Sequence, residues 1–137
     1  MIKRIVFDGN DGTGKTTRLN RMREIFPNLE YADRGIFSET TLVDGLFASG
    51  AGVIVGQTSE TERLRREFYD RIKSDTSTLY IICRASPHIC QKRILLRGDS
   101  IEEEFHTMDD LVKYNDRFDV LIDIVRDLPN VMVVNTD

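Results

Sequence analysis

The sequence has few cysteines and few prolines, and each scarcity excludes a class of protein. Its 137 residues contain two cysteines and three prolines. Two cysteines are too few for a disulfide framework, and Cys83 and Cys90 do not have the C-x-x-C spacing of a zinc site. We therefore expect both cysteines to be small buried hydrophobic residues in a reducing compartment. The low proline content, together with 40% apolar residues, argues against linker character and disorder.

Long apolar runs and an excess of basic charge are also missing. The N-terminal segment MIKRIVFDGND has no long apolar core, so no secretory signal is evident and we expect a cytoplasmic protein. The longest weakly polar stretch, residues 42–55, is interrupted by Asp44 and by several glycines, which make it unsuited to span a bilayer. The net charge of −4 excludes a basic field over the whole surface, so a nucleic-acid partner is not favoured, although a local basic strip stays open.

Chain length and apolar periodicity predict one α/β domain over residues 1–137. Strands are expected at residues 2–7, 29–32, 78–83 and 131–134. Helices are expected at residues 15–26, 38–47, 60–73, 86–96 and, with a start signal at either Ser100 or Thr107, up to residue 128. Residues 48–58 are rich in small side chains and show no clear pattern. Strands that alternate with helices indicate a parallel sheet with helices on both faces.

One short stretch has the sharpest pattern in the chain. Residues 9–16, GNDGTGKT, fit G-x-x-x-x-G-K-[ST] at every fixed position. Glycines let backbone N–H groups wrap phosphate oxygens, and the following helix adds its N-terminal dipole. The lysine of such a loop reaches the β- and γ-phosphates, and the threonine hydroxyl completes the Mg²⁺ shell. We therefore predict ATP and Mg²⁺ as cofactors, with the nucleotide bound by Asn10, Asp11, Gly12, Thr13, Gly14, Lys15, Thr16 and Thr17.

Several arginines are placed to neutralise phosphate charge together with Lys15. Arg34 is expected at the tip of a strand beside the loop, at the carboxyl edge where open α/β sheets bind ligands. Arg93 and Arg97 are four residues apart, so they share a helix face and can project together towards the phosphates. Phosphoryl transfer depends mainly on positioning and charge neutralisation. All four cations are therefore predicted to be catalytic, although a solvated surface remains the alternative for the arginines.

Two aspartates are candidates for positioning the phosphoryl acceptor. Asp11 lies inside the loop, where a turn-forming role is the alternative. Asp33 precedes Arg34 and could position the acceptor, hold Arg34 or orient Mg²⁺ through water. The sequence does not distinguish between these three roles of Asp33. The predicted metal residues are therefore Thr16 and Asp33.

These motifs, in this order, resemble those of thymidylate kinases and bacteriophage deoxynucleoside monophosphate kinases. The family loop typically reads F-E-G-x-D-G-x-G-K-[ST]-T, which residues 7–17 match except for Asp8 in place of Glu. Asp33-Arg34 resembles the D-R motif. The run TLYIICRASPHICQKRILLRG resembles the strand, helix and lid that end in R-x-x-x-R-G, and LVKYNDRF resembles the following helix. The resemblance implies ATP-dependent phosphoryl transfer to a deoxynucleoside monophosphate, with Asp11 near the acceptor sugar and residues 135–136 near the adenine.

The chain is shorter than the family pattern. Thymidylate kinases carry a further strand and helix, with an R-E-P-G-G-like acceptor motif, before the D-R strand, and residues 27–32 leave no room for them. We therefore expect a three-layer P-loop NTPase fold with about four strands, the loop strand central and a shallow acceptor site. The alternatives are a nucleoside or nucleic-acid kinase acting on a DNA base or hydroxyl, and a non-catalytic ATP-binding interaction module. An apolar edge on a shortened sheet would favour a homodimer.

Overall fold

The computed structural model describes residues 4–10, 12–28, 31–36, 53–57, 66, 69–70, 72–98 and 107–137 of the chain. The elements are β1 (Arg4–Gly9), α1 (Lys15–Ile25), β2 (Tyr31–Ile36), β3 (Val53–Gln57), β4 (Thr78–Arg84), α4 (Pro87–Arg97), α6 (Met108–Val125) and β5 (Val131–Asn135). The helix predicted at residues 38–47 lies outside the described residues. The helix predicted at residues 60–73 is described only in part, and residues 66, 69–70 and 72–74 are helical. None of the helices in the described ranges combines the length and apolarity that a bilayer crossing requires.

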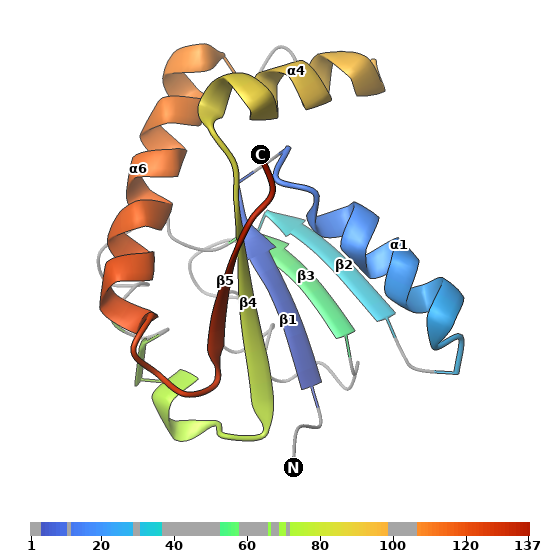
Figure 1. Ribbon diagram of the computed structural model, residues 1–137, viewed down its shortest axis with the longest axis vertical. Coiled ribbons are helices and arrows are strands. Elements are labelled where there is room, and N and C mark those ends of the chain that lie inside the picture. The colour runs from blue at the N-terminus through green and yellow to red at the C-terminus, as the bar shows by residue number, and fades with distance from the viewer. Residues whose placement is uncertain are drawn as a thin grey trace.

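Five parallel strands form one sheet in the order β2-β3-β1-β4-β5 (Figure 1). β1 is central, as the sequence predicts. The sheet has one strand more than expected, because β3 lies in the stretch of small residues that showed no clear pattern. A buried parallel strand is a short apolar run without alternation, so VIV between glycines gives a weak signal.

Different helices cover the two faces of the sheet (Figure 1). Because successive strand residues point to opposite faces, Val6 and Phe7 belong to different apolar clusters. The first cluster joins β1 and β4 to α6 and contains Val6, Ile72, Tyr80, Ile82, Phe118, Leu121, Ile122 and Val125. The second joins the same strands to α1 through Phe7, Leu19 and Cys83. The structure therefore has the three layers of the predicted fold class.

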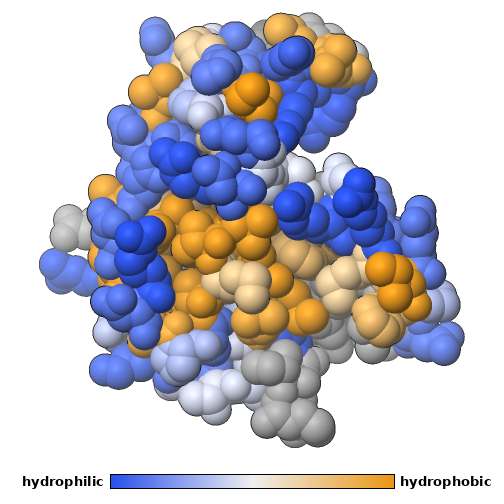
Figure 2. All heavy atoms as spheres, in the orientation of Figure 1, coloured by the Kyte–Doolittle hydropathy of each residue, from blue (hydrophilic) through white to orange (hydrophobic). Residues whose placement is uncertain are grey.

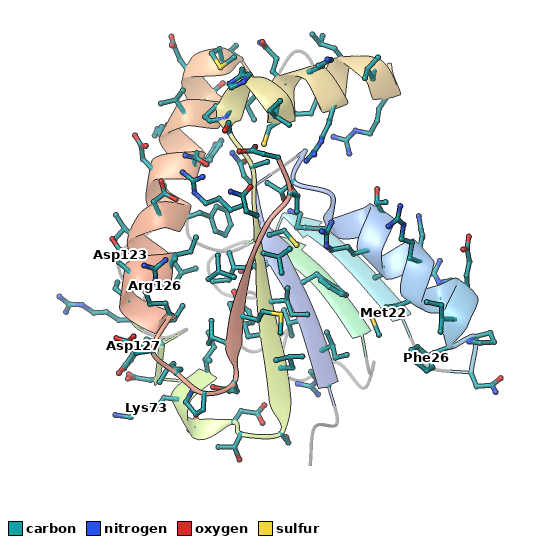
Figure 3. All side chains as sticks on the ribbon, viewed as in Figure 1. Met22, Phe26, Lys73, Asp123, Arg126 and Asp127 are labelled. Atoms are coloured by element: carbon teal, nitrogen blue, oxygen red, sulfur yellow. The ribbon has the colours of Figure 1, made fainter. Side chains whose placement is uncertain are left out.

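The α1 side of the sheet is less completely covered than the α6 side. Met22 of α1 packs against the second cluster, whereas Phe26 after the helix is 52% exposed (Figure 3). Figure 2 shows apolar side chains gathered over the sheet between α1 and α6. On β5, Met132 is 49% exposed. Apolar surface of the central sheet thus reaches solvent beside the site described below.

Both long helices after β4 begin and end at the residues that their sequences favour. Ser86 precedes α4 in an extended conformation and Pro87 occupies its first turn, as predicted. Gly98 ends α4 with a φ of 68°, which a glycine adopts without strain. Thr107 is the N-cap of α6, and its hydroxyl accepts a hydrogen bond from the Asp110 backbone N–H at 3.3 Å. Thr107 is therefore the start signal that the helix uses.

A carboxylate holds the turn that leads into β4. Asp75 accepts hydrogen bonds from the Ser77 backbone N–H at 3.2 Å and from the hydroxyls of Ser77 and Thr78, each at 2.7 Å. Burial raises the pKa of Asp75, but these hydrogen bonds together lower the pKa by more than burial raises it. The pKa of Asp75 therefore lies below its ordinary value. The ionised carboxylate therefore stabilises the turn at neutral pH.

Substitution of Asp75 is expected to give a pH-dependent loss of stability. Because the folded pKa is below the unfolded one, the stabilisation is fully present above the unfolded pKa and is lost as the pH falls through the folded pKa. We expect Asp75→Asn to cost about 1 kcal/mol at neutral pH. The gap between the wild type and the variant should narrow below about pH 4. Urea unfolding across this range measures it, and a gap that stays constant in acid would contradict the assignment.

Candidate functional site

The loop between β1 and α1 lies flush against β4 and α4, and glycine is required for this fit. Gly9, Gly12 and Gly14 have φ values of 146°, 79° and 85°, a region that other residues rarely adopt. A Cβ on Gly9 would lie 2.3 Å from the Cys83 carbonyl oxygen, and one on Gly12 would lie 2.6 Å from the Cys90 carbonyl oxygen. The backbone therefore approaches its neighbours more closely than any side chain permits.

The side chain of Lys15, at the end of this loop, folds back to the first residue of the loop. Its side chain is 7% exposed, and Nζ donates a hydrogen bond to the Gly9 carbonyl oxygen at 2.5 Å. Lys15 is also the first residue of α1, whose N-cap is Gly14 and whose first turn has no acidic residue. The positive end of the helix dipole and a largely buried ammonium thus lie at one place, which favours an anion. This is the arrangement that the sequence predicts for phosphate binding.

Polar side chains fasten the outer side of the loop to the surrounding elements. Asn10 donates from Nδ2 to the Leu111 carbonyl of α6 at 3.1 Å, and its own carbonyl accepts from the Thr13 hydroxyl at 2.6 Å. Arg93 of α4 donates from Nη1 to the Gly12 carbonyl at 3.0 Å. The loop is therefore supported by both helices that follow β4.

The start of the loop is supported from inside the sheet. Asp8 is fully buried, and its carboxylate accepts hydrogen bonds from the Gly9 backbone N–H at 2.8 Å and from the Tyr80 hydroxyl. A buried carboxylate needs such partners, because an unpaired one is costly to desolvate. Asp8 therefore fixes the bend at which β1 becomes the loop.

A pocket of about 590 Å³ opens beside the loop, between α4 and the N-terminal end of α1 (Figure 2). It is lined by Gly12, Gly14, Thr17, Arg18, Arg93, Leu96, Arg97, Asn135, Thr136 and Asp137. Three arginines and the apolar side chain of Leu96 face one space. Such a combination suits a ligand with negative charge at one end and a flat apolar part at the other.

The two arginines of α4 line this pocket together, as their spacing predicts, but they differ in exposure. Arg97 is exposed. Arg93 donates from Nη1 to Thr136 Oγ1 at 3.0 Å as well as to Gly12, and from Nη2 to the Thr136 carbonyl. Arg93 therefore lines the pocket while both of its terminal nitrogens also bind protein oxygens.

The structure also corrects the placement of Asp33 and Arg34. Their strand, β2, pairs with β3 and not with β1, so the expectation that it lies beside the loop strand is wrong. Two strand spacings, roughly 10 Å, separate β2 from β1. The strand also continues to Ile36 with an irregular register, so Arg34 is not at its tip. Asp11 and the side chains of Thr16, Asp33 and Arg34 lie outside the described residues.

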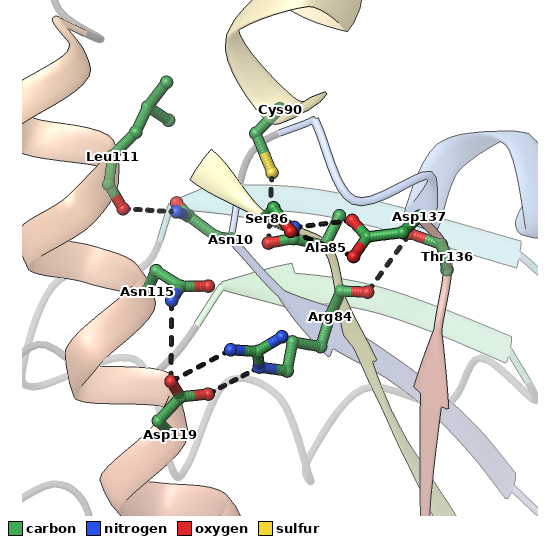
Figure 4. A network of polar contacts seen from close by, with 10 residues as sticks. All are labelled: Asn10, Arg84, Ala85, Ser86, Cys90, Leu111, Asn115, Asp119, Thr136 and Asp137. Atoms are coloured by element: carbon green, nitrogen blue, oxygen red, sulfur yellow. Dashed lines mark hydrogen bonds and ion pairs between the residues drawn. The ribbon is translucent and has the colours of Figure 1, made fainter. Parts of the chain in front are cut away.

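A second polar network lies beside the loop, at the carboxyl end of β4 (Figure 4). Arg84 forms a two-pronged ion pair with Asp119 of α6 at 2.7 and 3.2 Å, and this contact is the main cause that raises the pKa of Arg84. Asp137 accepts hydrogen bonds from the Ser86 backbone N–H and from the Ser86 hydroxyl. Both bonds lower the pKa of Asp137, and the bond from the backbone N–H has the larger effect. Sequence reasoning missed this network, because its members lie far apart in the chain.

The cysteines and the carboxylates of the described residues do not form a metal centre. Cys83 and Cys90 are both buried, as predicted, and neither forms a disulfide; burial raises the pKa of the Cys83 thiol. No group of three or more His, Cys, Asp or Glu side chains within the described ranges could hold a metal ion.

Comparison with known proteins shows which fold this is. No model of a known protein family matches the chain, and no curated protein is significantly similar to it. Solved structures do match. The YorR protein of Bacillus subtilis, in complex with phosphorylated GDP, has a TM-score of 0.62 at 18% identity, covering 97% of this chain and 84% of its own. The shikimate kinase of Acinetobacter baumannii, in complex with shikimate, has a TM-score of 0.63 at 13% identity, covering 100% and 85%. A gluconokinase of Sinorhizobium meliloti has a TM-score of 0.54 at 13% identity, covering 97% and 82%.

At these identities the similarity establishes the fold, which is that of P-loop kinases. The predicted fold class is thereby confirmed.

Proposed function

We propose that this protein is a phosphotransferase that moves the γ-phosphoryl group of ATP to a small acceptor in the presence of Mg²⁺. The observation that carries the proposal is the position of Lys15. It places a largely buried ammonium at the N-terminus of α1, above a loop whose glycines have the conformation of a phosphate cradle. The P-loop kinase fold supports the same conclusion.

The residues of the loop divide the work of binding and charge neutralisation. Lys15 would leave the Gly9 carbonyl for the β- and γ-phosphates, where its charge offsets the negative charge of the transferred group. The backbone N–H groups at the start of α1 would bind phosphate oxygens. The pocket between α4 and residues 135–137 would hold the base and sugar, with Arg18 and Arg97 adding positive charge. Buried surroundings strengthen these interactions relative to water.

Mg²⁺ would be held by the Thr16 hydroxyl at the start of α1 and by the phosphates of the nucleotide. When bound, the ion neutralises phosphate charge and polarises the transferred group. The loop fits this use, because it supplies a hydroxyl-bearing residue directly after Lys15 and offers no cluster of carboxylates that would hold the ion alone within the described ranges.

The acceptor is proposed to be a deoxynucleoside monophosphate or a related nucleotide. The order of the loop, Asp33-Arg34 and Arg-x-x-x-Arg-Gly motifs supports this choice. Since β2 is the edge strand beyond β3, Asp33 and Arg34 belong to the side of the site opposite the base pocket. We propose that Arg34 binds the acceptor phosphate, with Asp11 or Asp33 positioning the acceptor.

Removal of the Arg34 charge should affect the acceptor and spare the donor. We expect Arg34→Met to raise KM for the acceptor by about tenfold or more, the loss of one charge-assisted hydrogen bond, with less than twofold change in KM for ATP. Steady-state kinetics with each substrate varied in turn measure the split. Arg126→Met is the matched control, because Arg126 is the C-cap of α6, at the end of that helix away from the loop (Figure 3). An equal rise of both KM values would contradict the acceptor-side assignment.

A second candidate acceptor is a small hydroxylated metabolite. Two solved structures with this fold are a shikimate kinase and a gluconokinase by name, and the resemblance to nucleotide kinases rests on short motifs. In this reading the loop and Lys15 keep their roles, and only the groups on the β2 side differ. A non-catalytic ATP-binding module would retain the donor pocket and transfer nothing.

One experiment separates these candidates. The protein is incubated with Mg²⁺ and γ-labelled ATP against deoxynucleoside monophosphates, nucleosides, single-stranded DNA, shikimate and gluconate, and labelled products are separated. We expect label in a deoxynucleoside monophosphate. Label in another acceptor would replace the proposed substrate class. Retained ATP binding with no transfer to any acceptor would refute the enzymatic function and leave the binding module.

A further inference from the structure

Thr136, directly after β5, joins three segments of the chain at the outer side of the loop. Its backbone N–H donates to the Arg84 carbonyl at 2.7 Å, which continues the ladder between β5 and β4. Its hydroxyl lies 2.9 Å from the Thr13 carbonyl and 3.3 Å from the Arg84 carbonyl. Because a hydroxyl has one hydrogen, the shorter contact identifies Thr13 as its acceptor.

Arg93 completes the arrangement from α4. Its Nη1 lies 3.0 Å from both the Gly12 carbonyl and the Thr136 hydroxyl oxygen, and its Nη2 donates to the Thr136 carbonyl. The Thr136 hydroxyl thus accepts from Arg93 while it donates to Thr13. Two consecutive carbonyls of the loop are therefore held by two side chains that also hold each other.

The direction of a carbonyl fixes the direction of the next N–H group. A trans peptide is planar, so its C=O and N–H point to opposite sides. Holding the Gly12 carbonyl outward turns the N–H of Thr13 inward, and holding the Thr13 carbonyl outward does the same for the N–H of Gly14. Gly12 and Gly14 both have positive φ, and glycine exchanges readily between backbone conformations, so these peptide planes need an external restraint.

We infer that Arg93 and Thr136 form a latch that orients two N–H groups of the loop for phosphate binding. The inference rests on the proposed function and deepens it by naming positioning residues for the donor. Arg93 acts here through the Gly12 carbonyl and not as a cation on the transferred group. Without the latch, a rotated peptide plane would direct a carbonyl oxygen at the phosphate and oppose binding.

The test compares variants of Thr136 that differ only in the hydroxyl. We expect Thr136→Val, which keeps the shape and loses the hydroxyl, to weaken ATP binding by about tenfold, the loss of roughly one hydrogen-bonded restraint. Thr136→Ser restores the hydroxyl and should recover most of the affinity. Isothermal titration with ATP and Mg²⁺ measures this. Thr107→Val, at the N-cap of α6, is the control for a general loss of stability.

A second readout needs no nucleotide. Amide ¹H–¹⁵N NMR of the free protein should show changed or exchange-broadened signals for Thr13 and Gly14 in Thr136→Val, and unchanged signals in Thr107→Val. Arg93→Gln serves as the second latch variant if Thr136→Val does not fold. Unaltered loop signals together with unaltered ATP affinity in a latch variant would refute the inference. A wild type that binds no ATP would refute the proposed function instead, and the NMR comparison would still decide the latch.

Discussion

Replacement of Lys15 by alanine is expected to lower kcat by about 10³-fold or more, the largest effect of any single substitution in this protein. Lys15 is 7% exposed, and its ammonium donates a hydrogen bond to the Gly9 carbonyl at 2.5 Å, so its charge is already held at the start of the loop. In the transition state no other described residue of the loop carries a positive charge. Single-turnover rates with saturating acceptor measure the effect.

The fold should survive this substitution, which makes the result interpretable. Lys15 is the first residue of α1, and alanine is favourable in a helix. Lys113→Ala, on the exposed side of α6, is a control of the same chemical change. We expect the control to retain full activity. A Lys15→Ala enzyme with undiminished kcat would show that the loop does not hold the transferred phosphate, and the donor site would have to lie elsewhere.

Substitution of Gly12 by alanine should be strongly destabilising. Alanine would have a φ of 79°, and its Cβ would lie 2.6 Å from the carbonyl oxygen and 2.8 Å from the Cα of Cys90. Both neighbours are helix backbone and cannot rotate away, so α4 or the loop must shift. We expect a loss of about 3 kcal/mol, from left-handed strain and overpacking together. Urea unfolding measures the loss, and ATP binding should weaken as well.

Gly98 provides the matched control for this prediction. It has a similar φ of 68° but has no atom within 4 Å of the position of its Cβ. Gly98→Ala therefore carries the backbone strain alone, about 1 kcal/mol. The difference between the two variants isolates the close approach of the loop to α4. Equal losses at both positions would mean that the loop has room for a side chain, against the geometry described here.

The glycine-rich loop and its lysine could be predicted from the sequence because their information is local. A glycine-rich stretch between an apolar run and a helical pattern determines the loop, the start of α1 and the place of Lys15 within a few residues. The signals at Pro87 and Thr107 act over one turn of helix, and each has the role that its type favours. Ser86 takes the predicted N-cap position without a side-chain capping bond, because its hydroxyl donates to Asp137. The loop conformation and the helix starts depend on backbone geometry and capping, and both are determined by residues within one short segment.

The remainder required contacts between distant segments. β3 is a short apolar run without alternation, so nothing local distinguishes it from a loop. Its presence moves Asp33 and Arg34 one strand away from β1. Gly12 is a variable position of the G-x-x-x-x-G-K-[ST] pattern, and its positive φ together with its packing against Cys90 explains why glycine stands there. Nor does the spacing of Arg93 and Arg97 reveal that one of them binds the backbone of the loop.

The bond between Thr136 and Thr13 also sets when a newly made chain can complete its site. The two residues are 123 positions apart. At typical rates of synthesis the loop waits on the order of ten seconds on the ribosome before its partner has been made. The parallel pairing of β5 with β4, which places Thr136, is non-local and forms slowly. A nascent chain therefore presents a glycine-rich segment without its final restraint until synthesis has passed β5.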